Sequence, residues 1–555
     1  MKKLIALLLA MVCVLSVCAG CGGGGLAGEE QGQVQADNPD EKVKLTVGIP
    51  SNALVASYKD NALTKYLEAE MNVELEFVEY SGGSEIGTQI ATNVTAGEAL
   101  PDILFGITLG DGVINRYGKD GYFRDLAPYF QDKEGASKVF WERIEANLTE
   151  LEIENVKRQL VNADTGGIYA IPSMETSLVD IIDYQVWINT EWLDAVGMEM
   201  PTDIDSLYKV LVAFKTKDPN GNGKADEIPL YGSEAGGLGA DVINYLINMF
   251  LYFNDRKPFN VTDDGKLYVP YTTDEYREAM IFINKLYKEK LIGDAIFATS
   301  QSDIQKVATP ANGTALAGIF CGHLTLHATK NSAVLEQYEP LPYLEGQTVV
   351  FNDNTFRRNI YITQDCKNPD RAFALIMKMW EEETSYRVRY GEFGANWTWA
   401  DEGAISDCGI PAKIKILNDP FAQPNACLWS DASGTLNVYA EGEAAQMGEA
   451  STAWEKRKSA LHAQSRANAD AAAAENNPTN ICPTLNFTED EAELTTKARS
   501  ACADYMKKSR TDFIKNKMDP TNDAVWNNYV KQIEEYGVND WLAAAQKAYD
   551  RGTKM

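Results

Sequence analysis

The pattern of apolar and polar residues switches between strand and helix periods along the early part of the chain. Residues 43–50 (VKLTVGIP) are apolar enough for a buried strand, and residues 72–80 (NVELEFVEY) alternate as a strand does. Between them, residues 61–71 place their apolar side chains on one helical face. A helical stretch over 85–98 and a short apolar run at 101–107 follow. This order of elements predicts a parallel sheet with right-handed crossovers.

The middle of the chain mixes predicted strands and helices. A strand-like segment, DYQVWIN (183–189), precedes two helices. Gly197 is a natural C-terminal stop for the first helix, and Thr202 is the expected N-cap of the second. Residues 275–291 predict a further amphipathic helix, and residues 313–322 predict a strand that returns to a sheet.

The last third of the chain is predicted to be mostly helical. Residues 487–515 carry a Thr488–Glu491 capping box, which marks the start of a helix. A helix pair follows over 523–537 and 538–551. The alanine-rich, polar stretch 459–480 indicates an exposed helix or an insertion.

The N-terminus predicts export. Residues 1–20 contain two lysines, an apolar run and small residues, which are the parts of a signal peptide. Cys21 follows Cys18-Ala19-Gly20, and the stretch resembles a bacterial lipobox, in which the cysteine is lipidated; the alternative is an ordinary cleaved signal. Residues 21–42 are glycine-rich and polar, so we expect a flexible tether. A diacylated cysteine would anchor the protein at the extracellular face of the cell membrane.

The composition and net charge of the chain exclude some classes of binding partner. The chain is 45% hydrophobic and 24% charged, as globular proteins are, and its length allows more than one core. The formal net charge of −29 argues against nucleic acid or an anionic lipid surface as partner. The cysteines after Cys21 show no CxxC pair; disulfide pairing and buried free thiols both remain open.

Residues 218–229 (DPNGNGKADEIP) have the composition of a loop that binds a hard cation. Calcium loops take ligands from positions 1, 3, 5, 7 and 9, with glycine at position 6, and Gly223 stands at that position here. Pro229 stands where a bidentate carboxylate is expected, so Glu227 is the expected substitute. The all-oxygen set suits structural Ca²⁺, and the alternative is a plain Asn-Gly turn. The predicted ligands are Asp218, Asn220, Asn222, Lys224 (backbone), Asp226 and Glu227.

Sequence motifs for catalysis do not support an enzyme. No HExxH, GxSxG, P-loop or GxGxxG motif occurs in a supporting context. Eighty acidic residues make pairs of carboxylates uninformative for a glycoside hydrolase. We therefore expect no catalytic residues, while a secreted enzyme remains the rival hypothesis.

Several segments together resemble the family 1 extracellular solute-binding proteins of ABC transporters, particularly the large lipoproteins of Gram-positive bacteria. The resemblance runs from about residue 43 to the C-terminus and is most specific in 184–230 and 511–551. The segments that carry it are the lipobox, PDILFG (101–106), GYFRDLAPYF (121–130), GGIYAIP (166–172), the long run from Trp187 to Leu230, and the closing helices.

The resemblance implies an α/β protein of two hinge-linked lobes, a periplasmic-binding-protein-like fold of type II with a helical C-terminal region. We expect lobe 1 at 43–172 with a return segment at about 313–365. Lobe 2 is then expected at 173–312 together with about 366–555. The resemblance also implies a monomer that captures an oligosaccharide, or another small polar solute, between the lobes and presents it to a transporter permease. The alternative is a secreted carbohydrate-active enzyme or a surface carbohydrate-binding scaffold.

Sugar recognition requires aromatic planes beside polar side chains, and some segments combine them. Residues 390–400 (YGEFGANWTWA) hold two tryptophans among glycines, residues 424–431 add a third, and residues 51–61 follow a predicted parallel strand, where such sheets bind ligands. Each tryptophan has core packing as its alternative, and Trp187 and Trp192 are expected to be structural. The candidate ligand-binding residues are Asn52, Tyr58, Glu175, Asn396, Trp397, Trp399 and Trp429.

Overall fold

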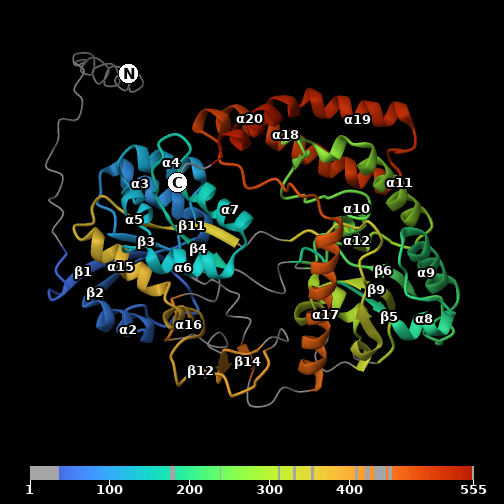
Figure 1. Cartoon of the computed structure of the whole chain (residues 1–555), viewed down its shortest axis with the longest axis horizontal. Helices are drawn as coiled ribbons and strands as arrows, with labels where there is room; N and C mark the ends of the chain where they lie inside the picture. Colours follow the sequence, from blue (N-terminus) through green and yellow to red (C-terminus); the bar gives the residue numbers. More distant parts are fainter. Residues whose placement is uncertain are drawn as a thin grey trace, which may run out of the picture.

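The structure of the protein is a computed structural model with two α/β lobes side by side (Figure 1). It describes residues 37–175, 182–237, 239–310, 313–328, 333–351, 355–406, 411–418, 426–429, 445–447 and 453–552. The signal, Cys21 and most of the predicted tether lie outside the described residues. In the described part of the chain, no helix is both long and apolar enough to cross a membrane.

The first lobe is built on a five-stranded sheet in the order β2-β1-β3-β11-β4. Strand β1 pairs in parallel with both β2 and β3, which confirms the parallel sheet predicted from the early part of the chain. Strand β11 runs antiparallel to its neighbours β3 and β4. The strands are β1 (Val43–Pro50), β2 (Val73–Tyr80), β3 (Ile103–Phe105), β4 (Ile171–Glu175) and β11 (Thr355–Ile362).

Helices cover this sheet and continue into a small aromatic region. Asn61 caps the first of them, because its Oδ1 accepts a hydrogen bond from the Leu63 amide. The helices are α2 (Ala62–Met71), η1 (Gly83–Glu85), α3 (Ile86–Ala96), α4 (Asp111–Lys119), α5 (Ala127–Gln131), α6 (Lys138–Asn147), α7 (Glu150–Leu160), α15 (Pro369–Met379) and α16 (Glu382–Tyr390). A three-stranded sheet follows, formed by β12 (Trp397–Trp399), β13 (Ile414–Ile416) and β14 (Ala445–Met447).

The second lobe has its own four-stranded sheet in the order β10-β5-β9-β6. Its strands are β5 (Val186–Asn189), β6 (Ile228–Tyr231), β9 (Ala317–Cys321) and β10 (Tyr338–Pro340), and β7 (Asn260–Val261) pairs separately with β8 (Leu267–Tyr268). Its helices are α8 (Thr190–Val196), α9 (Ile204–Thr216), α10 (Val242–Ile247), η2 (Pro270–Thr272), α11 (Asp274–Lys288), α12 (Ala295–Ala298), α13 (Gln301–Ala308), α14 (Leu324–His327) and η3 (Ala333–Gln337). Trp187 and Trp192 are buried in this core, as predicted.

Two helix ends in the second lobe test the cap predictions. Gly197 ends α8 in the left-handed conformation, as expected from its lack of a side chain. The predicted cap at Thr202 is wrong by one residue. Asp203 caps α9 instead, because its carboxylate accepts a hydrogen bond from the Ser206 amide, which donates to it at 2.7 Å.

The C-terminal helices belong to the second lobe and confirm the helical C-terminal region. They are α17 (Ala453–Asn476), α18 (Glu489–Ile514), α19 (Asp523–Glu535) and α20 (Val538–Arg551). Figure 1 shows α17 along the side of the second lobe that faces the first, with α18, α19 and α20 over one end of the lobe. The Thr488–Glu491 capping box is present at the start of α18. Side chains of α18, α19 and α20 join the core of the second lobe.

The two sheets divide the chain differently from the expected boundaries. The expected return segment 313–365 includes β9 and β10, but both strands lie in the second sheet, and only β11 returns to the first. Residues 366–388 and Trp429 were expected in lobe 2, yet buried side chains from both pack in the core of the first lobe. A fully buried apolar strand such as β9 fits either sheet, so its composition does not reveal its partner strands.

Residues 482–489, called the bridging segment below, connect the second lobe to the first. Asn155 accepts a hydrogen bond from the Thr484 amide at 2.8 Å, and the Asn486 side chain donates to the Val161 carbonyl at 2.6 Å. At the far end of α20, Arg551 donates to the Asn486 carbonyl at 2.7 Å. The C-terminal helices are therefore tied to both lobes through this segment.

We predict that Gly318→Ala destabilises the second lobe. A Cβ at this position of β9 would lie 2.2 Å from a ring carbon of Phe214, which is fully buried in α9. Overpacking of this kind costs about 1–3 kcal/mol of unfolding free energy. Gly293→Ala is the control, since a Cβ there meets no atom within 4 Å. Thermal unfolding of the two variants gives the comparison, and equal melting temperatures would contradict the close packing of β9 on α9.

Candidate functional site

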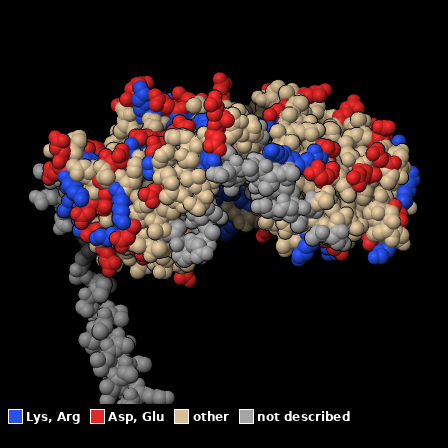
Figure 2. All heavy atoms as spheres, turned by 90° about the horizontal axis from the view of Figure 1, so that it is seen from below, with Lys and Arg blue, Asp and Glu red and all other residues tan. Residues whose placement is uncertain are grey.

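Two cavities that share lining residues lie beside the bridging segment. The larger has a volume of about 660 Å³ and the smaller about 300 Å³. Arg256, Pro258, Arg499 and Trp541 line both, so we treat them together as the joined cavities. Figure 2 shows the molecule as two masses with a hollow between them. All residues that line the joined cavities belong to the second lobe, to its C-terminal helices or to the bridging segment, whose hydrogen bonds reach the first lobe. We take these cavities as the candidate site.

Three parts of the chain form most of these walls, and Glu234, Asp241, Tyr271 and Trp541 complete them. The loop after α10 contributes residues 254–259, the bridging segment contributes residues 482–485 and Phe487, and α18 contributes side chains between Thr496 and Arg510. The Trp541 ring of α20 packs edge-on against Phe259, with centroids 4.8 Å apart. Apolar and aromatic surfaces thus stand beside amide, hydroxyl and guanidinium groups, which is the combination that binding sites for polar ring compounds use.

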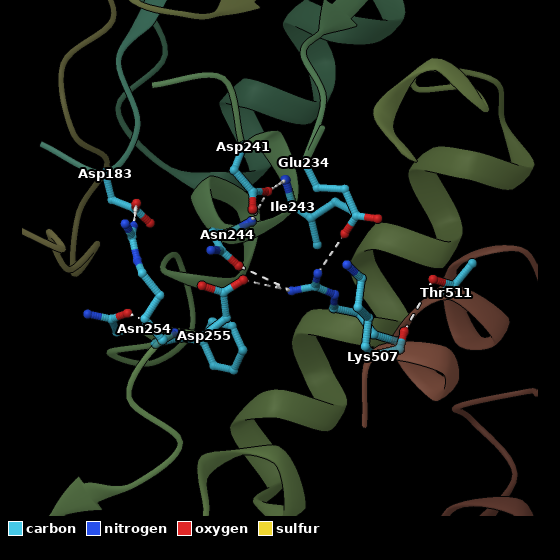
Figure 3. Close-up of polar contacts among 12 residues, drawn as sticks. Asp183, Glu234, Asp241, Ile243, Asn244, Asn254, Asp255, Lys507 and Thr511 are labelled. Atoms are coloured by element: carbon cyan, nitrogen blue, oxygen red, sulfur yellow. Dashed lines mark hydrogen bonds and ion pairs between the residues drawn. The ribbon is translucent and has the colours of Figure 1, made fainter. Parts of the chain in front are cut away.

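A buried guanidinium holds α18 against the loops of the second lobe. Arg510 donates to Glu234 at 2.7 Å and to the Asn244 side chain at 3.3 Å, and it lies 3.9 Å from a carboxylate oxygen of Asp255 (Figure 3). Asp241 lies in the same group and accepts hydrogen bonds from the first amides of α10. Burial raises the pKa of Asp241 to about 6, against the opposing effect of the Arg510 charge. The carboxylates of this wall are therefore held by specific partners.

A second ion pair lies at the edge of the same site. Arg256, in the loop after α10, pairs with Asp183, which follows the chain crossing between the lobes (Figure 3). The Asp183 side chain is 7% exposed, whereas that of Arg256 is 56% exposed. Arg256 therefore presents a partly open cation at the wall of the joined cavities.

The predicted aromatic loop 390–400 does form an aromatic group, on the first lobe. Trp397 is fully buried and its indole N–H donates to the Gly391 carbonyl at 2.9 Å. Asn396 uses its side-chain oxygen to accept the Glu392 amide within the same loop. Trp399 is 47% exposed and stands edge-on to Trp397, with centroids 5.5 Å apart. Trp399 and Phe393, which is 36% exposed, are thus the aromatic side chains of this loop with surfaces open to a ligand.

The structure brings Tyr58 and Trp429 together in the core of the first lobe. Phe77 contacts both rings, with centroid distances of 5.4 Å and 5.3 Å. Tyr58 donates its hydroxyl to the Pro50 carbonyl, and Trp429 donates its indole N–H to the Thr64 hydroxyl.

The remaining two candidates lie at the ends of strands of the first lobe. Asn52 follows β1 and accepts the Leu54 amide at 2.9 Å, which shapes the turn there. Glu175 ends β4, and its side chain lies outside the described part of the structure. Neither these residues nor the candidate aromatic side chains line the joined cavities within the described residues.

The residues that line the joined cavities carried no local signal in the sequence. Trp541 stands in an ordinary amphipathic helix, and Arg256 stands in a loop without a motif. Trp541 belongs to the closing segment 511–551, in which the family resemblance is most specific, whereas Arg256 lies outside the most specific segments. Contacts across more than 280 positions of the chain bring them together, and no spacing pattern encodes such contacts.

The loop 218–227 folds inward around its oxygen-bearing side chains. Asp218 accepts the Asn222 and Gly223 amides at 3.2 and 3.0 Å. Asp226 accepts hydrogen bonds from the side-chain amides of Asn222 and Asn220, at 3.0 and 3.3 Å. Gly223 has a φ of 73°, the left-handed conformation that the turn requires and that glycine adopts without strain. The side chains predicted as ligands therefore face one another.

The Glu227 carboxylate indicates whether the loop 218–227 is suited to bind a cation. Its Oε1 atom is buried and has no hydrogen-bond partner within the described structure. Burial, followed by the nearby charges of Asp218 and Asp226, raises the pKa of the Glu227 carboxyl. Within the described residues there is no group of three or more His, Cys, Asp or Glu side chains placed to hold a metal. The loop nevertheless fits a hard cation, because amide and backbone oxygens supplement its carboxylates.

We predict that Arg510→Met lowers the free energy of unfolding by about 3–5 kcal/mol, since it leaves buried carboxylates without their cation. The control is Lys508→Met, two residues away, which removes a 70% exposed partner of Asp512 and should cost less than about 1 kcal/mol. Urea titration of both variants measures the difference. A loss for Arg510→Met as small as that of the control would show that the buried network does not stabilise the lobe.

Comparison with solved structures shows the same fold in two-lobed binding proteins. The structure of the Streptococcus pneumoniae substrate-binding protein FusA in complex with kestose matches with a TM-score of 0.65 and 22% identity, covering 92% of this chain and 99% of that one. An HMO-binding, ABC-transporter-associated solute-binding protein of Bifidobacterium longum infantis matches with a TM-score of 0.70 and 20% identity, covering 93% of this chain and 100% of that one.

Sequence comparison agrees over the whole chain. The fructooligosaccharide ABC transporter substrate-binding protein FusA of Streptococcus pneumoniae is 25% identical, covering 97% of this chain and 96% of the relative. The polygalacturonan/rhamnogalacturonan-binding protein YtcQ of Bacillus subtilis is 26% identical, covering 72% and 74%. The family model for the bacterial extracellular solute-binding protein matches residues 50–377. The chain belongs to the bacterial extracellular solute-binding protein family.

Proposed function

We propose that this protein captures an oligosaccharide between its two lobes and delivers it to an ABC transporter permease. The observation that carries the proposal is the pair of joined cavities beside the bridging segment, in a chain of this family. The similarity to FusA supports it, because that protein is named for fructooligosaccharide transport and the match spans both chains nearly end to end.

The chemistry of the walls supports a sugar. Phe487 offers an apolar surface for the C–H faces of a pyranose, and Asn254 and Thr484 offer hydrogen bonds for its hydroxyls. Trp541 lines both cavities but is only 6% exposed, so it supports this wall from the core of the lobe. Trp399 is a second candidate contact, on the first lobe. A ligand that touches both lobes binds the closed arrangement more tightly than the open one, and this difference in affinity drives closure.

The proposal treats the protein as a receptor rather than an enzyme or a scaffold. The family and the relatives above are binding proteins. Two lobes joined by a linking segment allow a protein to capture a solute and release it. A surface adhesin does not require such an arrangement. We further propose that Cys21 is lipidated and holds a monomeric receptor at the extracellular face of the cell membrane.

We predict that at least one neutral or acidic oligosaccharide binds the purified protein with a measurable heat and raises its melting temperature. Isothermal calorimetry over a panel of fructo-, gluco-, galacto- and uronic-acid oligosaccharides measures the affinity, and chromatography of the same mixtures detects hydrolysis. Trp541→Ala should weaken the binding, because it removes a wall of both cavities. Absence of binding to every sugar, or hydrolysis of one of them, would contradict the proposed receptor function.

We propose that the loop 218–227 holds a structural Ca²⁺. The side chains of Asp218, Asn220, Asn222, Asp226 and Glu227, with the backbone oxygen of Lys224, would bind it. When bound, the ion neutralises the carboxylates and so stabilises the loop. Two solved structures with the same fold support the proposal. One is named as an EF-hand mutant of FusA, and the other is named as the alginate-binding protein AlgQ2 without calcium ion, so both names refer to a calcium-binding loop or to calcium.

We predict that a chelator lowers the melting temperature and that excess Ca²⁺ restores it. Calcium at a hundredfold excess over its Kd stabilises the folded state by about 2.7 kcal/mol. Glu227→Gln should remove most of this dependence, since it removes the charge of a carboxylate whose buried Oε1 atom has no hydrogen-bond partner in the described structure. The matched control is Glu199→Gln, an exposed position outside the loop. A melting temperature that does not respond to chelation would contradict a structural calcium ion.

A further inference from the structure

The joined cavities carry a positive charge in a strongly acidic protein. The formal net charge of the chain is −29. The basic residues that line the two cavities nevertheless outnumber the acidic ones: Arg256, Lys257, Arg499, Lys507 and Arg510 against Glu234, Asp241 and Asp255. The walls therefore differ in sign from the protein as a whole.

The acidic residues of the walls already have partners. Arg510 binds Glu234 at 2.7 Å and lies 3.9 Å from Asp255. Asp241 uses one carboxylate oxygen to accept the amides of Ile243 and Asn244 at 2.9 and 3.0 Å. Figure 3 shows these carboxylates gathered around the guanidinium. Each of these carboxylates therefore has a hydrogen-bond or ion-pair partner within the protein.

Two of the basic residues of α18 that line the larger cavity have no carboxylate within ion-pair distance in the described structure. They are Arg499 and Lys507, and both are exposed. The Arg499 guanidinium lies 6.0 Å from the centre of the Phe487 ring, in the bridging segment. Figure 3 shows Lys507 on α18, beside the residues of the Arg510 network. Both charges are therefore available to a ligand.

The spacing of Arg499 and Lys507 along α18 places both side chains on the face that lines the larger cavity. Arg499, Ala503 and Lys507 are four residues apart, so they share one face of α18. The two basic residues are separated by about 12 Å along the helix axis. Ala503 between them is small and also lines the larger cavity, which leaves room for a chain of sugar rings.

From this arrangement we propose that the oligosaccharide is acidic, and that Arg499 and Lys507 bind its carboxylates while Phe487 and Pro258 contact its rings. The proposal rests on the proposed function and specifies its substrate class. Guanidinium and ammonium groups form charge-assisted hydrogen bonds with carboxylates, which are stronger than those with hydroxyls. A neutral oligosaccharide would leave both cations without a counter-charge.

The test compares acidic oligosaccharides with their own neutral forms. Oligomers of galacturonate, of mannuronate and of guluronate are titrated into the full-length protein beside the same oligomers after reduction of their carboxyl groups. We expect at least one acidic oligomer to bind roughly tenfold or more tightly than its reduced form. Its affinity should fall as sodium chloride is raised, because salt screens the exposed charges.

Substitutions of single basic residues then show which of them bind the carboxylates of the oligosaccharide. Arg499→Gln and Lys507→Gln should each weaken binding of the acidic oligomer roughly tenfold. They should leave the melting temperature unchanged, since neither residue is buried. Lys497→Gln is the matched control, because this exposed lysine of α18 lines neither cavity. The control should bind like the wild type.

The outcomes separate this proposal from the proposed function. If a reduced or neutral oligosaccharide binds as tightly as the acidic one and Arg499→Gln changes nothing, the acidic specificity is wrong and sugar capture stands. If no acidic oligomer binds but a neutral sugar does, the acidic specificity is again overturned. If neither class binds, both proposals fail.

Discussion

The buried ion pair between Arg510 and Glu234 holds α18 in the position on which the joined cavities depend. Glu234 follows β6 in the second lobe, whereas Arg510 lies almost 280 residues later, so the pair joins the early and the late parts of the lobe. The same guanidinium lies within 4 Å of Asp255, in the loop that forms the opposite wall. Without it, buried carboxylates would be left unpaired, and the outer face of α18 would lose its support. Both the shape and the charge of the cavities follow from this contact.

Features that depend on neighbouring residues could be predicted from the sequence. The parallel arrangement of β1, β2 and β3 follows from their apolar patterns and from the helices between them. The capping box at Thr488 and the stop at Gly197 follow from side-chain chemistry within a few positions. The loop 218–227 also turns its predicted ligands toward one another, since each is placed by local turns.

Features that depend on distant partners could not be predicted in this way. The strand β9 was expected in the first lobe, but its pairing with β5 and β6 is decided by surfaces far along the chain. Trp397 and Trp429 have the chemistry of a sugar platform, yet neighbouring aromatic rings bury both of them. Arg499 has no distinctive local pattern, yet it is exposed and lines both cavities. Side-chain type predicts what a residue is able to bind, whereas nonlocal packing decides whether its surface is open.

The protein has two lobes and a polar and aromatic site beside the segment that links them, and we propose that a bound ligand stabilises the closed arrangement of the lobes. Small-angle X-ray scattering tests this most directly, with the protein measured alone and at saturation with the oligosaccharide that calorimetry shows to bind. Capture between the lobes predicts a smaller radius of gyration in the presence of the sugar, and no change with a sugar that does not bind. An unchanged radius of gyration at full saturation would contradict the claim that the ligand is held by closure of the two lobes.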